Sequence, residues 1–173
     1  MTAAKPHIKM LEQNDCATIA SDFAGMGWSK PIGHFEAYLA QQRSGARTVW
    51  IAFCDGAFAG YITVVWLSEY PPFAERGIPE IADLNVLPKY RGRGVASCLL
   101  DIAEQDCTRR SPVIGIGVGL YAAYGAAQRL YVKRGYVPDG HGVTCNYQPV
   151  TPGGAAIVDD ELVIWLTKPE LEK

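Results

Sequence analysis

Two glycines stand among three cationic side chains in the segment Asn85–Leu100, "NVLPKYRGRGVASCLL". The apolar run "EIADLNVL", which leads into this segment, predicts a strand, and the run "VASCLLDIAEQ" predicts a helix. Glycine lets the backbone approach a ligand closely, and main-chain N–H groups at the start of a helix bind anions with help from the helix dipole. The junction therefore predicts a site for an anionic ligand, with Lys89, Arg91 and Arg93 adding positive charge.

Two common phosphate-binding motifs do not fit this junction. A Walker loop requires GxxxxGK[ST], which the sequence lacks. A dinucleotide-binding turn requires GxGxxG, and the segment Gly92–Ser97 begins correctly but ends in serine, in mid-chain after a predicted hairpin. The segment Gly115–Tyr121, "GIGVGLY", is a second near match. A nicotinamide or flavin enzyme therefore rests on these near matches alone.

The segment Arg91–Ala96 instead fits the pattern [Q/R]-x-x-G-x-[G/A]. At this point the chain resembles the GNAT superfamily of acyl-CoA N-acyltransferases. Two longer segments strengthen the resemblance: "IADLNVLPKYRG" is similar to the family's "DLxVxPxYRG", and "AAQRLYVKRGY" is similar to its "AxxLYxKxGF". The predicted order of elements also agrees, so the resemblance covers nearly the whole chain, with its specific motifs between Ile81 and Tyr136.

The resemblance implies acetyl-CoA as the acyl donor and assigns contacts with it to three parts of the chain. The main chain of Leu84, Asn85 and Val86 would pair with the pantetheine arm, and an N–H near Val86 would polarise the thioester carbonyl. Tyr124 stands seven residues before the motif tyrosine, where the family often has asparagine. The loop that would bind the pyrophosphate consists of Arg91, Gly92, Arg93, Gly94, Val95 and Ala96.

The reaction that the resemblance implies needs an acid and a base. A tyrosine with a pKa of about 10 can protonate a leaving thiolate whose parent thiol has a pKa of about 8.5, and the resemblance assigns this role, beside the cofactor, to Tyr131. A lysine-like amine titrates at about 10.4, and a carboxylate near the sulfur could remove its proton, directly or through water. Asp83 and Glu80 are the candidates, and strand alternation places them on opposite faces. Each of these residues also has a structural interpretation that stays open. Tyr131 could simply pack against the sheet, Asp83 could make a structural hydrogen bond, and Glu80 could be a solvated strand end.

The acceptor implied by the resemblance is a primary amine of a small molecule or a peptide. The amine would attack directly in a ternary complex, because no cysteine occupies a family nucleophile position that we can identify. Aromatic side chains from the first helices and from residues 68–79 could line its pocket, namely Trp28, Tyr70 and Phe73, with Glu69 beside them. The alternative is a non-catalytic module that binds acyl-CoA as a sensor or interaction partner.

An α/β fold has to position these groups, and the resemblance implies one GNAT domain over residues 1–173. Its sheet would be mixed and mostly antiparallel, flanked by helices, with parallel fourth and fifth strands that splay apart. Asp55 and Gly56 predict a hairpin turn. Residues 68–79, with three prolines, predict a lid or substrate loop. The sequence predicts strands at 7–11, 47–54, 57–67, 80–87, 111–120, 142–150 and 160–167, and helices at 14–27, 29–45, 92–110 and 121–135.

The composition is that of an ordinary globular protein, with 49% hydrophobic and 20% charged residues and a net charge of −2. No long basic tract predicts nucleic-acid binding, and no segment reaches the roughly 18 apolar residues of a membrane span. The five scattered cysteines and three distant histidines have no metal-ligand spacing, and the first residues lack the apolar region of a secretory signal. We therefore expect a cytoplasmic protein without a metal site. The glycine-rich strand at 111–120 and the last strand pair are compatible with a homodimer.

Overall fold

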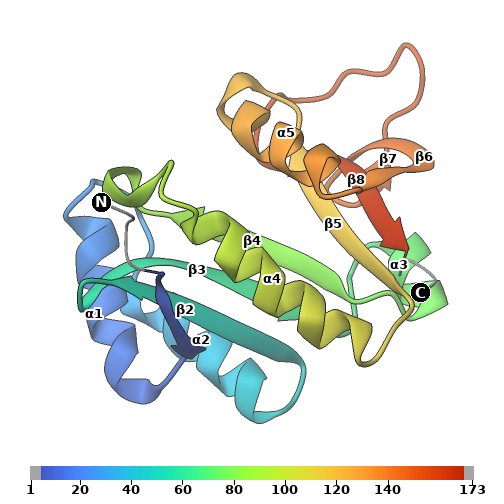
Figure 1. The fold of residues 1–173 in the computed structure, drawn as a ribbon. Helices are drawn as coiled ribbons and strands as arrows, with labels where there is room; N and C mark the ends of the chain where they lie inside the picture. The colour runs from blue at the N-terminus through green and yellow to red at the C-terminus, as the bar shows by residue number, and fades with distance from the viewer. Residues whose placement is uncertain (1–4, 170–173) are drawn as a thin grey trace. The chain divides into compact units, whose positions relative to one another are not determined.

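One sheet of eight strands forms in the part of the chain that the computed structural model describes, residues 5–169 (Figure 1). The strand order is β1-β2-β3-β4-β5-β8-β6-β7, in which β4 and β5 pair in parallel and most other neighbours pair antiparallel. The predicted α/β class and mixed, mostly antiparallel sheet are confirmed. The strands are His7–Met10 (β1), Arg47–Cys54 (β2), Ala57–Val65 (β3), Glu80–Val86 (β4), Val113–Gly119 (β5), Val137–Cys145 (β6), Gln148–Pro149 (β7) and Leu162–Pro169 (β8).

The helices lie between the strands in the order that the sequence predicts, with one addition. They are Gln13–Ala24 (α1), Ile32–Arg43 (α2), Pro71–Arg76 (α3), Val95–Thr108 (α4) and Gly125–Lys133 (α5). Short 3₁₀ turns at Pro88–Tyr90 and Ala122–Tyr124 precede the segments that lead into α4 and α5. In the described residues, no helix is both long enough and apolar enough to cross a membrane.

The chain divides into two compact units, each built from two separate segments. Unit 1 holds the described residues up to Trp66 together with Ala82–Asp106, and unit 2 holds Leu67–Ile81 together with the described residues from Cys107 onward. The division falls inside β4, because Glu80 and Ile81 pair with β5 in unit 2 while the rest of β4 belongs to unit 1. That residues 1–173 form one domain stays a prediction.

The core of unit 1 is aromatic and lies between helices α1 and α2 and the β2–β3 hairpin. Asp55 and Gly56 form the hairpin turn with φ of 52° and 79°, as the sequence predicts. Phe23 of α1 stacks on Phe35 of α2 at 6.0 Å between ring centroids, and its ring meets the edge of Tyr61 on β3 at 5.9 Å. The helices are therefore anchored to the strand that runs beside β4.

The core of unit 2 explains the glycine-rich sequence of β5. Gly115, Gly117 and Gly119 share one face of the strand, because alternate residues point the same way. A Cβ at Gly115 would lie 2.1 Å from Phe73 Cε2, and Cβ atoms at the other two glycines would lie 2.9 Å from Trp165 and 2.5 Å from Tyr124. The glycines thus make room for three rings of the same unit.

Three local predictions differ from the structure. The predicted loop 68–79 contains helix α3, because a proline suits its first turn and Gly77, with φ of 62°, ends it in the left-handed conformation. The predicted strand 142–150 is a hairpin of β6 and β7, turning at Asn146 and Tyr147, which both have positive φ. Strand β6 also begins earlier, at Val137, because its glycines form an irregularity rather than its end.

Candidate functional site

The loop Arg91–Ala96 opens helix α4 with two glycines in the left-handed conformation. Gly92 has φ of 72° and Gly94 has φ of 80°, and a Cβ at either position would meet no atom within 4 Å. The backbone is therefore open to a ligand at the start of a helix of 14 residues. The guanidinium of Arg93 lies 5.3 Å from the centre of the Tyr90 ring and 3.5 Å from Asp55. The exposed glycine backbone and the nearby cations fit an anion such as a pyrophosphate.

Arg91 joins this loop to the end of β4. Its Nε donates a hydrogen bond of 3.1 Å to the carbonyl of Val86, and its guanidinium lies 5.8 Å from the centre of the Trp28 ring. Arg91 therefore has a structural task besides the positive charge that the sequence assigns to it.

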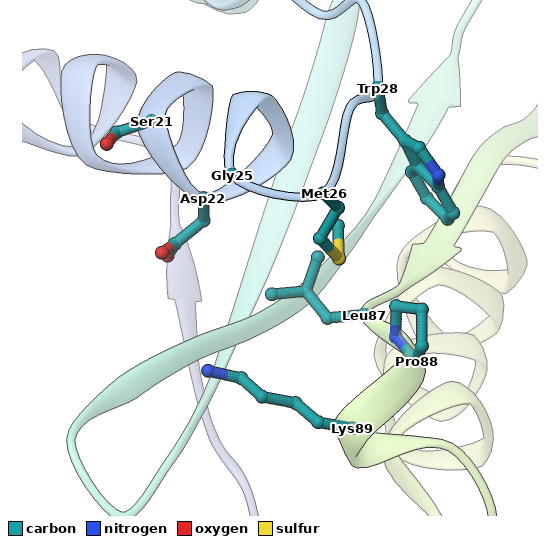
Figure 2. A pocket seen from close by; sticks show the side chains of 8 residues that line it. All are labelled: Ser21, Asp22, Gly25, Met26, Trp28, Leu87, Pro88 and Lys89. Carbon is teal, nitrogen blue, oxygen red and sulfur yellow. The ribbon is translucent and has the colours of Figure 1, made fainter.

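A pocket of about 480 Å³ lies beside the segment that leads into this loop (Figure 2). One wall comes from the end of α1 and the connection to α2, which includes Trp28, and the other comes from the residues after β4. In Figure 2 the side chains of Met26, Leu87 and Pro88 gather at its centre, while Lys89 extends along its edge. The lining residues are Ser21, Asp22, Gly25, Met26, Trp28, Leu87, Pro88 and Lys89.

Strand β4 is distorted at Asp83, which has φ of 51°. Asparagine and aspartate tolerate this left-handed conformation better than other residues with a Cβ. The regular alternation that predicts opposite faces for Glu80 and Asp83 is therefore interrupted. On β3, Gly60 permits a close approach, because a Cβ there would lie 2.4 Å from the carbonyl oxygen of Asn85.

The Asp83 carboxylate is held by a ring of donors in unit 1. Lys30 Nζ lies 3.0 Å from Oδ1 and 3.2 Å from Oδ2, Tyr38 donates to Oδ2 at 2.9 Å, and Asn85 Nδ2 donates to Oδ1 at 2.6 Å. Tyr61 also donates to Oδ2. These contacts link the connection before α2, helix α2 itself, and strands β3 and β4.

The same contacts set the charge of Asp83. Burial tends to raise its pKa, but the His34 imidazole, the Lys30 ammonium and the Tyr61 hydroxyl outweigh burial and hold the pKa well below its usual range. His34 Nε2 is 3.6 Å from Oδ2, an ion-pair distance rather than a hydrogen bond. Burial and the Asp83 charge in turn raise the pKa of Tyr61 far above its usual value. The carboxylate is therefore ionised and the Tyr61 hydroxyl is protonated.

The other candidate carboxylate, Glu80, belongs to unit 2. It is buried, with 8% of its surface exposed, and Ser68 Oγ donates a hydrogen bond of 2.5 Å to its Oε2. In the sheet it pairs with Gly115 of β5. Glu80 is thus a buried carboxylate at the β4–β5 pair rather than a solvated strand end.

The two tyrosines of the second motif lie at different places in unit 2. Tyr131, on α5, is buried, and burial raises its pKa to about 12. Tyr124 precedes α5; its ring covers Gly119, and its hydroxyl donates a hydrogen bond of 2.9 Å to Asp160. The roles of both tyrosines toward a cofactor stay predictions.

Tyr70 and Phe73, predicted to contact the acceptor, are packed inside unit 2. Both are almost fully buried, and the Tyr70 ring stacks on Trp165 with 4.2 Å between centroids. The Tyr70 hydroxyl donates to Asp139 Oδ2 at 2.7 Å, and the main-chain N–H of His141 donates to Oδ1 of the same carboxylate. The acceptor role of Tyr70 and Phe73 stays a prediction, to which the structure adds a role in the core.

Three residues that surround Asp83 were not predicted from the sequence, namely Lys30, Tyr38 and Tyr61. Their partners are 53, 45 and 22 residues away along the chain, so no local spacing could have revealed them. Within residues 5–169, we find no group of three or more His, Cys, Asp or Glu side chains that could hold a metal ion.

Solved structures with the same fold come from several bacteria. An N-acetyltransferase from Staphylococcus aureus Mu50 is 15% identical, with 96% of this chain and 99% of that chain covered and a TM-score of 0.69. The acetyltransferase yncA from Salmonella typhimurium, solved with its cofactor acetyl-CoA, is 18% identical, with coverage of 98% and 96% and a TM-score of 0.69. A ribosomal-protein-alanine N-acetyltransferase from Brucella melitensis is 16% identical, with coverage of 94% and 99% and a TM-score of 0.68. At these identities the likeness shows the fold.

The family itself follows from the sequence. Comparison with curated proteins gives no match. The profile described as "Acetyltransferase (GNAT) family" matches residues 14–136, which is 123 of the 173 residues and includes the glycine loop, the distorted β4 and α5. This chain therefore belongs to the GNAT family of acetyltransferases, whose acyl donor is acetyl-CoA.

Proposed function

We propose that this protein transfers the acetyl group of acetyl-CoA to a primary amine of a small molecule or a peptide. The observation that carries the proposal is the open, left-handed glycine loop Arg91–Ala96 at the start of α4, which follows the distorted strand β4 after one short 3₁₀ turn. Main-chain amides of this loop bind the pyrophosphate, and the main chain of Leu84, Asn85 and Val86 binds the pantetheine arm. Acetyl-CoA supplies the acetyl group as a thioester.

The transfer needs no acyl-enzyme. The amine nitrogen bonds to the thioester carbon in a ternary complex, the carbon–sulfur bond breaks, and the sulfur leaves with the bonding electron pair. The Val86 N–H stabilises the charge that develops on the carbonyl oxygen. The products are an amide and coenzyme A, and the amine's proton goes to a base or to water.

Tyr131 serves the leaving sulfur as a hydrogen-bond donor. Since its pKa is about 12, it stays protonated across the physiological range. Complete proton transfer from a hydroxyl with this raised pKa to a thiolate whose parent thiol has a pKa of about 8.5 is uphill. We therefore propose that Tyr131 stabilises the sulfur while it leaves, and that protonation is completed as coenzyme A departs.

Glu80 suits the role of base better than Asp83 does. The low pKa of Asp83 makes its carboxylate a weak proton acceptor, and several donors already occupy it. Glu80 is buried with a serine hydroxyl as partner. We assign removal of the amine's proton to Glu80 and the anchoring of β4 to Asp83.

We also propose a location for the protein and a class of acceptor. The described cysteines are free thiols, which supports a cytoplasmic location. We propose a small amine or peptide rather than a nucleic acid as acceptor, with Trp28 in the pocket of unit 1 among its contacts. A homodimer stays a prediction.

A non-catalytic acyl-CoA-binding module is the second candidate. The observation that favours this candidate is that neighbouring donors already bind the Asp83 carboxylate, which was one of the two candidate bases. Such a module binds acetyl-CoA without consuming it, so the two candidates differ in turnover and not in binding.

A thermal-shift titration with acetyl-CoA tests the binding half of the proposal, with NADH, NADPH and ATP as comparison ligands. A ligand present at about 100 times its Kd stabilises the folded state by roughly 2.7 kcal/mol. We expect a shift with acetyl-CoA alone, followed by thiol release in the presence of some primary amines. A shift with a dinucleotide alone overturns the proposal, and binding without thiol release across a broad amine panel favours the non-catalytic module.

A further inference from the structure

The ammonium of Lys30 occupies a box of aromatic rings and oxygen atoms in unit 1. Lys30 lies in the connection between α1 and α2, and its Nζ is 5.8 Å from the centre of the Phe23 ring and 5.2 Å from that of Tyr61. It donates to the Tyr61 hydroxyl at 2.6 Å and to both oxygens of Asp83. About three quarters of each side chain of the Lys30–Asp83 pair is removed from solvent, with exposed fractions of 22% and 23%.

The pair includes the residue of β4 whose backbone has a left-handed conformation. Asp83 is the one position of β4 with positive φ, and its carboxylate also accepts from Asn85 Nδ2 at 2.6 Å. The same Nδ2 lies 3.3 Å from the main-chain carbonyl of Asp83. The carboxylate therefore holds the side chain of Asn85, two residues along the strand, and with it the peptide groups that lie between them.

The main chain on both sides of Asp83 is fixed at several other points. The carbonyl of Ala82 accepts from Thr63 Oγ1 at 3.2 Å, that of Val86 accepts from Arg91 Nε, and the N–H of Leu87 donates to Ala59 at 2.9 Å. The carbonyl oxygen of Asn85 lies close to Gly60, where a side chain would leave no room for it. The Val86 N–H lies in the same peptide plane as the Asn85 carbonyl, so its direction follows the backbone of Asn85, whose side chain the Asp83 carboxylate holds.

We propose that Lys30 is a positioning residue of the acyl transfer. By pairing with Asp83, its ammonium holds the left-handed conformation of β4 and so aims the Val86 N–H at the thioester carbonyl. Lys30 itself makes no bond to the acetyl group. This inference rests on the proposed function, because it assigns Lys30 to the oxyanion-stabilising part of that mechanism.

If the Lys30–Asp83 pair only stabilised the fold, a different result would be expected. Loss of such a pair lowers the melting temperature but leaves the bound thioester unchanged. Loss of a positioning residue changes the polarisation of the carbonyl even in protein that is folded and saturated with acetyl-CoA. The carbonyl stretching frequency of bound acetyl-CoA, labelled with ¹³C at the carbonyl carbon, reports this polarisation without any acceptor.

The experiment compares isotope-edited infrared spectra of that labelled acetyl-CoA bound to the wild type, to Lys30→Met and to Lys9→Met. Lys9 is a matched control, because its ammonium also bonds to two carboxylates, those of Glu12 and Asp15, and lies 5.9 Å from an aromatic ring, but on β1. We expect a lowered frequency in the wild type and in Lys9→Met. In Lys30→Met the frequency returns most of the way to that of free acetyl-CoA, and kcat with a responsive amine falls about tenfold.

A milder variant and a double variant complete the test. Tyr38→Phe removes one hydrogen bond to Asp83 and keeps the ion pair, so it should shift the frequency in the same direction by less. If Lys30 acts through Asp83, Lys30→Met should add little in an Asp83→Asn background. An unchanged frequency in both Lys30→Met and Tyr38→Phe overturns the inference. A wild-type protein that binds no acetyl-CoA overturns the proposed function instead.

Discussion

Lys30 and Asp83 are 53 residues apart in the chain, yet the lysine ammonium lies 3.0 Å from the aspartate carboxylate. The pair joins the connection before α2 to the strand that carries the proposed cofactor contacts. It also changes the chemistry expected of Asp83, because a carboxylate held by an ammonium and three other donors binds a proton weakly. We therefore propose that Asp83, one of the two candidate bases in the sequence, anchors β4.

Replacing Asp83 with asparagine should destabilise the protein in a pH-dependent way. The pKa of Asp83 in the folded protein lies below its unfolded value of about 3.9, so the ionised carboxylate contributes stability above that pH and loses it as the pH falls further. At pH 7 we expect Asp83→Asn to cost about 1–3 kcal/mol in the free energy of unfolding. Calorimetry from pH 7 to pH 3 should show the wild type and variant converging below about pH 4; a constant gap would count against the ion pair.

Replacing Glu80 with glutamine should impair proton removal while preserving the fold. The Ser68 hydroxyl can donate to the new amide oxygen, so the melting temperature should change little. The kcat/KM for the amine should fall at least tenfold at neutral pH, and the deficit should shrink toward pH 10 as the free amine appears without help. A pH–rate profile parallel to that of the wild type would remove Glu80 from the role of base.

Replacing Tyr131 with phenylalanine should lower kcat at least tenfold and leave the Kd for acetyl-CoA nearly intact, because only the hydroxyl near the leaving sulfur is lost. In the wild type, a pKa of about 12 means that activity should not decline through ionisation of Tyr131 below about pH 11. Tyr136→Phe is the control, since Tyr136 is a buried neighbour whose ring lies 6.0 Å away. Equal turnover in the two variants would remove Tyr131 from the mechanism.

Replacing Gly94 with valine should abolish acetyl-CoA binding. Gly45 offers a matched control, because it has φ of 78° against 80° for Gly94, and a Cβ at either glycine would meet no atom within 4 Å. Both valine variants should lose about 1–3 kcal/mol of stability through the strained backbone. Calorimetric titration should show full affinity in Gly45→Val and none in Gly94→Val; similar affinities would mean that the loop is not the phosphate site.

Features that depend on short-range physics could be predicted from the sequence. Gly92 and Gly94 adopt positive φ at a strand–helix junction, and Asp55 with Gly56 turns the β2–β3 hairpin, because each conformation depends on a few neighbouring residues. The spacing of apolar residues along the chain correctly predicted most helices and strands. The local differences are one added helix, α3 in a proline-rich segment, and shifted boundaries and turns, whereas the order of the other helices is as predicted.

The contacts of the site residues depend on the tertiary fold and could not be predicted from the sequence. Asp83 meets Lys30, Tyr38 and Tyr61 because the helices and β3 fold against β4, and its left-handed backbone interrupts the alternation that a regular strand would have. In the sequence, the glycines of β5 resemble a nucleotide-binding loop. In the structure, they make room for the rings of Phe73, Trp165 and Tyr124. Contacts, burial and the resulting pKa values depend on segments that are distant in the chain, so no spacing along the sequence encodes them.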